Sequence, residues 1–171
     1  MLTKIYERNP SEKELQRIVD VLERDGIVIY PTDSVYAFGC SLRSPRAIDR
    51  LRRIRGKSSG ELPGPFTFVL AASSRVPDKA LERRQTIGVR IPANAVARAV
   101  VSALGCPLVT ASVREDGEAE YTTDPELIHE RYGREVSLVI DGGTGDCVPT
   151  TVVDLTGGEP EVLREGRGEL R

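Results

Sequence analysis

The chain has 171 residues, a net charge of -2 and 39% hydrophobic residues, which suits one domain with a core of ordinary size. It contains no run of about 18 apolar residues and opens with no signal-peptide pattern, so we expect a cytoplasmic protein without a membrane partner. The three cysteines, Cys40, Cys106 and Cys147, are widely spaced and form no CxxC unit. This spacing argues against a disulfide framework and against a zinc site.

The first predicted helix begins at Ser11 and ends at Gly26. Ser11 and Glu14 have the spacing of a capping box, and apolar residues then recur at helical spacing. Glycine is the residue type that most often follows the last turn of a helix. The apolar residues 27–30 come next and predict a buried strand.

Residues 30–40, which read YPTDSVYAFGC, place polar side chains where that strand ends. Pro31 fixes its own φ and keeps Tyr30 extended. In open α/β sheets, ligands bind at the carboxyl ends of strands, so the hydroxyls and the carboxylate that follow favour a binding site. Asp and Ser after a proline are also ordinary turn residues, and a capped turn is the alternative interpretation.

Ser44 and Pro45 predict the N-cap and the first position of a second helix. Its apolar residues at helical spacing are Ala47, Ile48, Leu51 and Ile54. Residues 43–57 contain seven basic residues and a single acid, Asp49. The basic residues are Arg43, Arg46, Arg50, Arg52, Arg53, Arg55 and Lys57. Exposed helix faces are usually charged, so the arginines indicate either a solvated surface or a local basic patch.

Further helices are predicted at residues 93–104 and 124–132. Strands are predicted at residues 66–70, 87–91, 108–111, 136–140 and 152–155. Helices alternating with strands predict an α/β fold, with a twisted mixed sheet flanked by helices, in a single domain over residues 1–171.

The residues able to do chemistry are mainly cations and hydroxyls at strand ends. The single histidine, His129, lies on a predicted late helix far from every motif, where we expect a solvated face and no nucleophilic or metal catalysis. The remaining candidates are Arg55, Lys57, Arg90, Arg164, Thr32, Ser112 and Thr151. Cations that converge on one cleft stabilise phosphate charge, which suits phosphoanhydride chemistry. The alternative is that several of these arginines form only surface ion pairs.

Several blocks of the sequence resemble the YrdC/YciO family, which includes threonylcarbamoyl-AMP synthases. Residues 30–40 are similar to its PTD-[ST]-x-Y-x-x-G-C signature. Residues 64–70, 86–92 and 107–112 resemble its P-G-P, arginine and serine strands, and residues 150–156 and 163–166 resemble its two closing blocks. The blocks keep the family's order, and the details at residues 86–88 and 108–114 resemble the YciO branch.

The resemblance implies a nucleotide-binding protein, similar to L-threonylcarbamoyladenylate synthases. Such enzymes make threonylcarbamoyl-AMP and pyrophosphate from threonine, bicarbonate and ATP, for the modification of tRNA adenosine. ATP or AMP would be bound, Mg²⁺ would come with the ATP, and no protein-only metal site is expected. By the same resemblance, Arg55, Lys57 and Arg90 would be catalytic, and threonine or the nucleotide would contact Thr32, Tyr36, Ser112, Arg114, Thr151 and Arg164.

Two other interpretations stay open. One is a non-catalytic YciO-type protein that binds tRNA or double-stranded RNA through the basic helix and a positive cavity. Such shape-based binding does not need aromatic platforms, which suits an aromatic content of 5%. The other is a degenerate relative that binds a ligand without turnover.

The sequence departs from the family pattern at two places. Residues 112–114 read SVR where the synthases have S-x-N, so Arg114, which donates hydrogen bonds but cannot accept them, replaces an amide. Only residues 58–62 lie between Lys57 and Pro63, where the family has a strand and at least one helix. We therefore expect a more open cavity and slow or undetectable adenylate formation.

Overall fold

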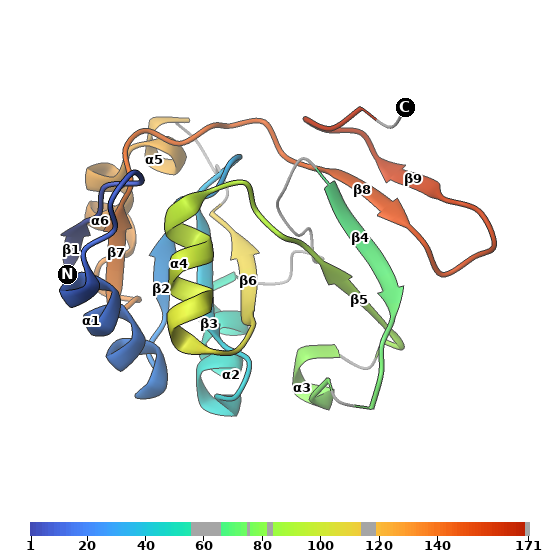
Figure 1. The fold of residues 1–171 in the computed structure, drawn as a ribbon, viewed down its shortest axis with the longest axis horizontal. Helices are drawn as coiled ribbons and strands as arrows, with labels where there is room; N and C mark the ends of the chain where they lie inside the picture. The colour runs from blue at the N-terminus through green and yellow to red at the C-terminus, as the bar shows by residue number, and fades with distance from the viewer. Residues whose placement is uncertain (56–65, 75, 82–83, 114–118, 170–171) are drawn as a thin grey trace.

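The computed structural model describes residues 1–55, 66–74, 76–81, 84–113 and 119–169 (Figure 1). They form a five-stranded sheet, in the order β1-β7-β2-β3-β6, and a four-stranded sheet, in the order β5-β4-β8-β9. Both sheets mix parallel and antiparallel pairs. The prediction of an α/β fold with a mixed sheet and flanking helices in a single domain is confirmed, with the strands divided between two sheets.

Helices cover both faces of the five-stranded sheet. Its strands are β1 (Leu2–Lys4), β2 (Val28–Tyr30), β3 (Ala37–Ser41), β6 (Leu108–Ser112) and β7 (Leu138–Asp141). Helices α1 (Glu12–Glu23) and α4 (Ala95–Leu104) pack on one face, and α2 (Pro45–Arg55) and α6 (Pro125–Tyr132) pack on the other. Because strand side chains alternate between faces, Val28 and Tyr30 lie in the first core and Ile29 lies in the second.

The second sheet lies beside the first, and β4 and β8 are its inner strands (Figure 1). Its strands are β4 (Phe66–Ala71), β5 (Thr86–Val89), β8 (Thr151–Asp154) and β9 (Glu161–Arg164). A short helix, α3 (Asp78–Leu81), precedes β5, and α5 (Glu120–Thr123) precedes α6. Within β4, Thr67 is buried while Phe68 and Leu70 are exposed, as expected for a strand with one covered face.

The predicted end signals of the first helix are wrong in detail. Ser11 occupies the N-cap position, but its side chain makes no capping hydrogen bond. The helix ends before Gly26, at the C-cap Arg24, and the left-handed residue that follows is Asp25, with φ 60°. The N–H of Gly26 instead donates to Val21 O at 2.8 Å, and a Cβ on Gly26 would lie 2.3 Å from that oxygen. Glycine is therefore required here for close approach rather than for a positive φ.

The second helix begins as predicted. Ala47 N donates to Ser44 Oγ at 3.1 Å, and Ser44 Oγ donates to Asp25 Oδ1 at 2.5 Å. Ala47, Ile48 and Leu51 are buried. Ser44 thus satisfies the first turn of α2 and ties it to the end of α1.

The single histidine, the cysteines and the lengths of the helices also bear on the sequence expectations. His129 is half-buried on α6 rather than fully solvated. All three cysteines are free, with Cys40 and Cys106 buried and Cys147 exposed. Among the helices that the structure describes, none is long and apolar enough to cross a membrane.

Replacing Ser44 by alanine is expected to lower the free energy of unfolding by about 1–2 kcal/mol, because the N-cap bond to α2 and the bond to Asp25 are both lost. The matched control is Ser11→Ala, which removes a hydroxyl from the N-cap position of α1, where no capping bond exists. Urea unfolding of both variants measures the difference. Equal losses would contradict the role assigned to Ser44.

Candidate functional site

The ends of strands from both sheets meet on one side of the molecule, at the top of Figure 1. In the first sheet, Thr32 follows β2, Tyr36 precedes β3 and Ser112 ends β6. In the second sheet, the strand-end residues are Arg90 after β5, Thr151 at the start of β8 and Arg164 at the end of β9. We call these six residues and Asp33 the strand-end site.

A buried ion pair joins the two halves of this site. The Arg90 guanidinium donates to Asp33 Oδ1, and the two side chains are only 6% and 16% exposed. Burial lowers the pKa of Arg90 to about 10, an effect that the charge of nearby Tyr30 partly opposes. Arg90 therefore stays charged at neutral pH. Its buried Nε has no hydrogen-bond partner among the described residues, so one donor remains unused.

Arg167 is a member of the site that the sequence interpretation missed. Its Nη1 donates to Asp33 O at 2.7 Å and to Asp146 Oδ2 at 2.5 Å. The backbone N–H groups of Val148 and Cys147, together with the Arg167 charge, hold the pKa of Asp146 below its usual range. Arg167 follows the closing block directly, but nothing in the spacing indicated that it would reach the loop after β2.

The polar groups of Thr32 and Tyr36 are used to build loops. Thr32 Oγ1 donates to Val35 O at 2.7 Å and accepts from Ser34 N at 3.1 Å. The Tyr36 hydroxyl donates to Gly143 O at 2.7 Å and accepts from Gly142 N at 3.2 Å. Burial raises the pKa of Tyr36 to about 12. The segment after β2 is therefore a capped turn and, at the same time, part of the strand-end site.

Thr151 and Arg164 hold the C-terminal segment in place. Thr151 Oγ1 accepts from Gly166 N at 3.0 Å and from Gly168 N at 3.1 Å, and donates to Gly168 O at 2.5 Å. Arg164 donates to Thr150 O through Nε at 3.0 Å and through Nη2 at 2.6 Å. A Cβ on Gly166 would lie 2.3 Å from the carbonyl carbon of Thr150, so this approach requires glycine.

Of the remaining predicted site residues, the structure describes Ser112 fully and Arg55 only in its backbone. Ser112 is half-buried, pairs with Ala37 across β3 and β6, and its hydroxyl makes no hydrogen bond to a described residue. Arg55 ends α2, but its side chain is not described. Lys57 and Arg114 lie outside the described residues. The roles predicted for all these residues stay predictions.

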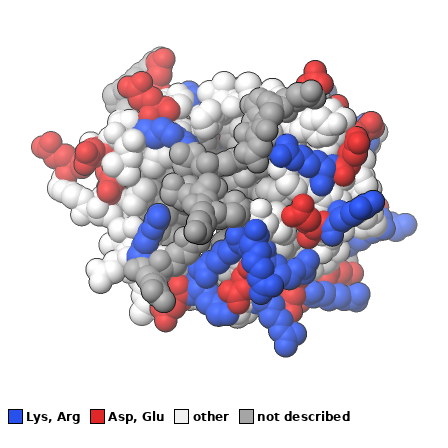
Figure 2. Space-filling model, turned by 180° about the vertical axis from the view of Figure 1, so that it is seen from behind, with Lys and Arg blue, Asp and Glu red and all other residues white. Residues whose placement is uncertain are grey.

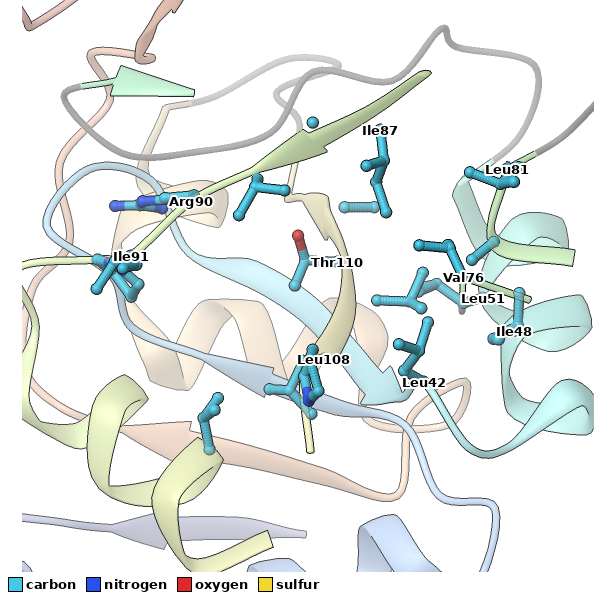
Figure 3. A pocket seen from close by; sticks show the side chains of 18 of the residues that line it. Leu42, Ile48, Leu51, Val76, Leu81, Ile87, Arg90, Ile91, Leu108 and Thr110 are labelled. Atoms are coloured by element: carbon cyan, nitrogen blue, oxygen red, sulfur yellow. The ribbon is translucent and has the colours of Figure 1, made fainter. Parts of the chain in front are cut away.

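A cavity of about 710 Å³ lies between α2, α3, α4, β5 and β6 (Figure 3). In Figure 3 the apolar side chains of Leu42, Ile48, Leu51, Val76 and Leu81 cluster at one end, and Arg90 and Ile91 lie at the other. Of the predicted site residues that the structure describes, Arg90 alone lines this cavity. The guanidinium of Arg90 points away from the apolar cluster.

The family of the chain follows from comparison with known proteins. The Sua5_yciO_yrdC family model, described as telomere recombination, matches residues 20–62 and 57–166. The chain is 34% identical over 197 residues to the uncharacterized protein YciO of Escherichia coli K12, covering 98% of this chain and 96% of YciO. It belongs to the Sua5/YciO/YrdC family. The crystal structure of E. coli YciO superposes with a TM-score of 0.90, over 99% of this chain and 97% of that one.

Similarity to the synthases is lower than to YciO. A threonylcarbamoyl-AMP synthase of Thiobacillus denitrificans is 30% identical over 169 residues, which cover 81% of this chain and 89% of that enzyme. Pyrococcus abyssi Sua5, solved in complex with L-threonine, shares the fold with a TM-score of 0.84 at 23% identity, over 97% of this chain and 57% of that one. The predicted resemblance to the YciO branch is confirmed.

The family model matches the chain in two stretches rather than in one. Its two stretches overlap at residues 57–62, within the connection that the sequence indicates to be short. The alignment with E. coli YciO runs over 197 residues, more than the 171 of the whole chain. An alignment longer than the chain requires residues in YciO that this chain lacks.

The Arg90–Asp33 pair can be tested with a double-mutant cycle. Asp33→Asn leaves a buried cation without its counter-charge and is expected to cost about 3–5 kcal/mol of unfolding free energy, as is Arg90→Met. The double variant retains no uncompensated charge. Its loss of unfolding free energy is therefore expected to be smaller than the sum of the two single losses, by about 2 kcal/mol or more. Urea unfolding measures all four proteins. Additive losses would show that the two side chains do not stabilise one another.

Proposed function

We propose that the chain binds ATP at the strand-end site and resembles L-threonylcarbamoyladenylate synthases in its reaction. The observation that carries this proposal is the buried Arg90–Asp33 pair, which keeps a cation where the two sheets meet, with an Nε donor that has no partner among the described residues. A buried donor without a partner favours a ligand that supplies an acceptor. The Ser112 hydroxyl, which makes no hydrogen bond to a described residue, offers a second polar group in the same site.

The reaction needs few covalent steps from the protein. N-carboxythreonine, formed from threonine and bicarbonate, attacks the α-phosphate of ATP, and pyrophosphate leaves. Positioning and electrostatic stabilisation provide most of the catalysis in phosphoryl transfer, so cations such as Arg90, Arg55 and Lys57 suit it. Mg²⁺ would enter with ATP and neutralise phosphate charge.

Relatives support this assignment, and two features of the chain limit it. A synthase is related to this chain over most of both lengths, and P. abyssi Sua5 binds L-threonine. Arg114 in place of an amide and the short connection at residues 58–62 would leave the site more open to water. Electrostatic stabilisation is worth most in a closed site, so we propose that turnover is slow compared with a synthase.

The test has a binding arm and a turnover arm. ATP with Mg²⁺ is expected to raise the melting temperature, by the equivalent of about 2.7 kcal/mol when ATP is at 100 times its Kd. Lys57→Ala is expected to remove most of this shift, because it deletes a charge-assisted phosphate contact. Lys13→Ala, on the exposed face of α1, is the control that removes an equal charge elsewhere.

In the turnover arm, the protein is incubated with labelled threonine, bicarbonate and ATP, and pyrophosphate and the adenylate are detected. We expect a rate well below that of a synthase measured in parallel. An unchanged melting temperature at millimolar ATP would contradict the proposal as a whole. A rate equal to that of the synthase would keep the proposed activity but contradict the argument from Arg114 and the short connection.

The exposed face of α2 supports a second candidate, binding of duplex RNA. Arg46, Arg50 and Arg53 are exposed on this helix, and basic side chains gather at the lower edge of the face in Figure 2, at the level of α2. Arg52 belongs less to this face, because it pairs with Asp49 at 3.9 Å. A row of cations on one helix suits contacts to a phosphate backbone.

If α2 binds RNA, affinity for a duplex is expected to fall steeply as salt rises, since phosphate contacts release counterions. Reversing Arg46, Arg50 and Arg53 to glutamate is expected to abolish binding while the melting shift with ATP is kept. Reversal of Lys4, Lys13 and Arg17, near the N-terminus, is the matched control. Filter binding at several salt concentrations measures this, and affinity that is independent of salt would leave α2 a solvated face.

A further inference from the structure

The cavity in Figure 3 shares Arg90 with the strand-end site but differs from that site in chemistry. Its walls come from α2, α3, α4, β5 and β6, and most of its lining side chains are apolar. Its volume of about 710 Å³ is within the range of small-molecule sites, roughly 300–1,000 Å³. A cavity of this size with apolar walls suits an apolar ligand.

The charges around the cavity all have one sign. Its lining includes the cations Arg52, Lys79, Arg84, Arg90 and Arg98, and no Asp or Glu among the described residues that line it. Such a lining attracts anions and disfavours cations.

Most of these cations already have partners within the protein. Lys79 lies 2.6 Å from Asp49, which also pairs with Arg52, and Arg90 pairs with Asp33. The exposed Arg84 side chain makes no hydrogen bond or ion pair with a described residue, and among those residues the Arg98 side chain donates only to Pro92 O, at 3.4 Å. The available positive charge therefore suits a ligand with a single anionic group rather than a triphosphate.

The cavity also lies next to the connection at which the family match divides into two stretches. Leu51 and Arg52, near the end of α2, line it, and so does β5, the neighbour of β4. The connection between α2 and β4 contains the overlap of the two family matches. The cavity is thus bounded by elements that flank this connection.

We propose that this cavity binds a medium-chain monocarboxylate of the fatty-acid type. The alkyl chain lies along the apolar side chains that Figure 3 labels, and the carboxylate meets one of the two exposed lining arginines at the rim, Arg84 or Arg98. This proposed carboxylate site differs from the proposed nucleotide site in its anion-binding residues, although Arg90 borders both.

The first experiment titrates the protein with decanoate by calorimetry, below the concentration at which decanoate forms micelles. Affinity is expected to rise by about fourfold per added methylene from octanoate to decanoate, because each methylene leaves water. Decylammonium, with the same chain and the opposite charge, is expected to bind at least about tenfold more weakly. Equal affinity for the two ions, or no dependence on chain length, would overturn the proposal.

Two sets of variants locate the site. Arg84→Ala combined with Arg98→Ala is expected to weaken decanoate binding about tenfold or more. Arg46→Ala combined with Arg53→Ala removes the same charge from the exposed face of α2 and is expected to change affinity less than about twofold. If the control pair weakens binding as much as the rim pair, the carboxylate does not bind at this rim.

Filling the cavity tests where the alkyl chain of the ligand binds. Thr110→Phe places a ring where Figure 3 shows the Thr110 side chain among the lining residues, and is expected to abolish decanoate binding while the melting shift with ATP is kept. Val101→Trp, on the partly exposed side of α4, serves if the first variant does not fold. Undiminished binding in a folded variant would overturn the proposal.

A bilayer surface offers similar chemistry, and one arm separates it from a free acid. We expect the protein to stay in the supernatant when it is sedimented with vesicles of anionic phospholipid. Sedimentation with the vesicles, together with absent decanoate binding, would show that the cavity does not take a free monocarboxylate.

Discussion

The buried ion pair between Arg90 and Asp33 is the constraint on which the two-sheet arrangement of the site depends. Each side chain comes from a different sheet, and both are largely removed from water. A buried charge is costly unless its partner is in place, so docking of the sheets and formation of the pair are coupled. Arg167 extends the same connection, because it reaches Asp33 O from the C-terminal segment. A ligand at this site therefore meets a cation whose position is already fixed.

Most hydroxyls at the strand ends serve the loops that surround this pair. Thr32, Tyr36 and Thr151 all use their oxygens for backbone groups of neighbouring loops. Their identities follow from the need to satisfy buried backbone donors and acceptors where strands stop. The atoms left for a ligand among the described residues are fewer, and the clearest are Arg90 Nε and the Ser112 hydroxyl. A motif can thus contribute to a site through the loops that it forms, without contacting a ligand itself.

Sequence patterns predicted the longer helices and six of the nine strands that the structure describes, and missed strands β1, β3 and β9. Helices α1, α2, α4 and α6 show clear apolar spacing or capping residues, and were predicted. Strand β3 lay within the motif and was not recognised, because it is buried on both faces and shows no alternation. Strands β1 and β9 are short, and long-range partners determine them. The contacts of Arg167 with Asp33 could not be predicted for the same reason, since 134 residues separate them.

Arg90 also connects the strand-end site with the apolar cavity. Its side chain lines one end of the cavity, while its guanidinium reaches Asp33. A ligand that packs against the stem of Arg90 would contact the same side chain that we propose to meet a nucleotide. The ion pair with Asp33 already holds this guanidinium in place, so any coupling between the two ligands would act through the position of Arg90 rather than through its ordering. By linkage, any such effect on affinity must be equal in both directions, whichever ligand binds first.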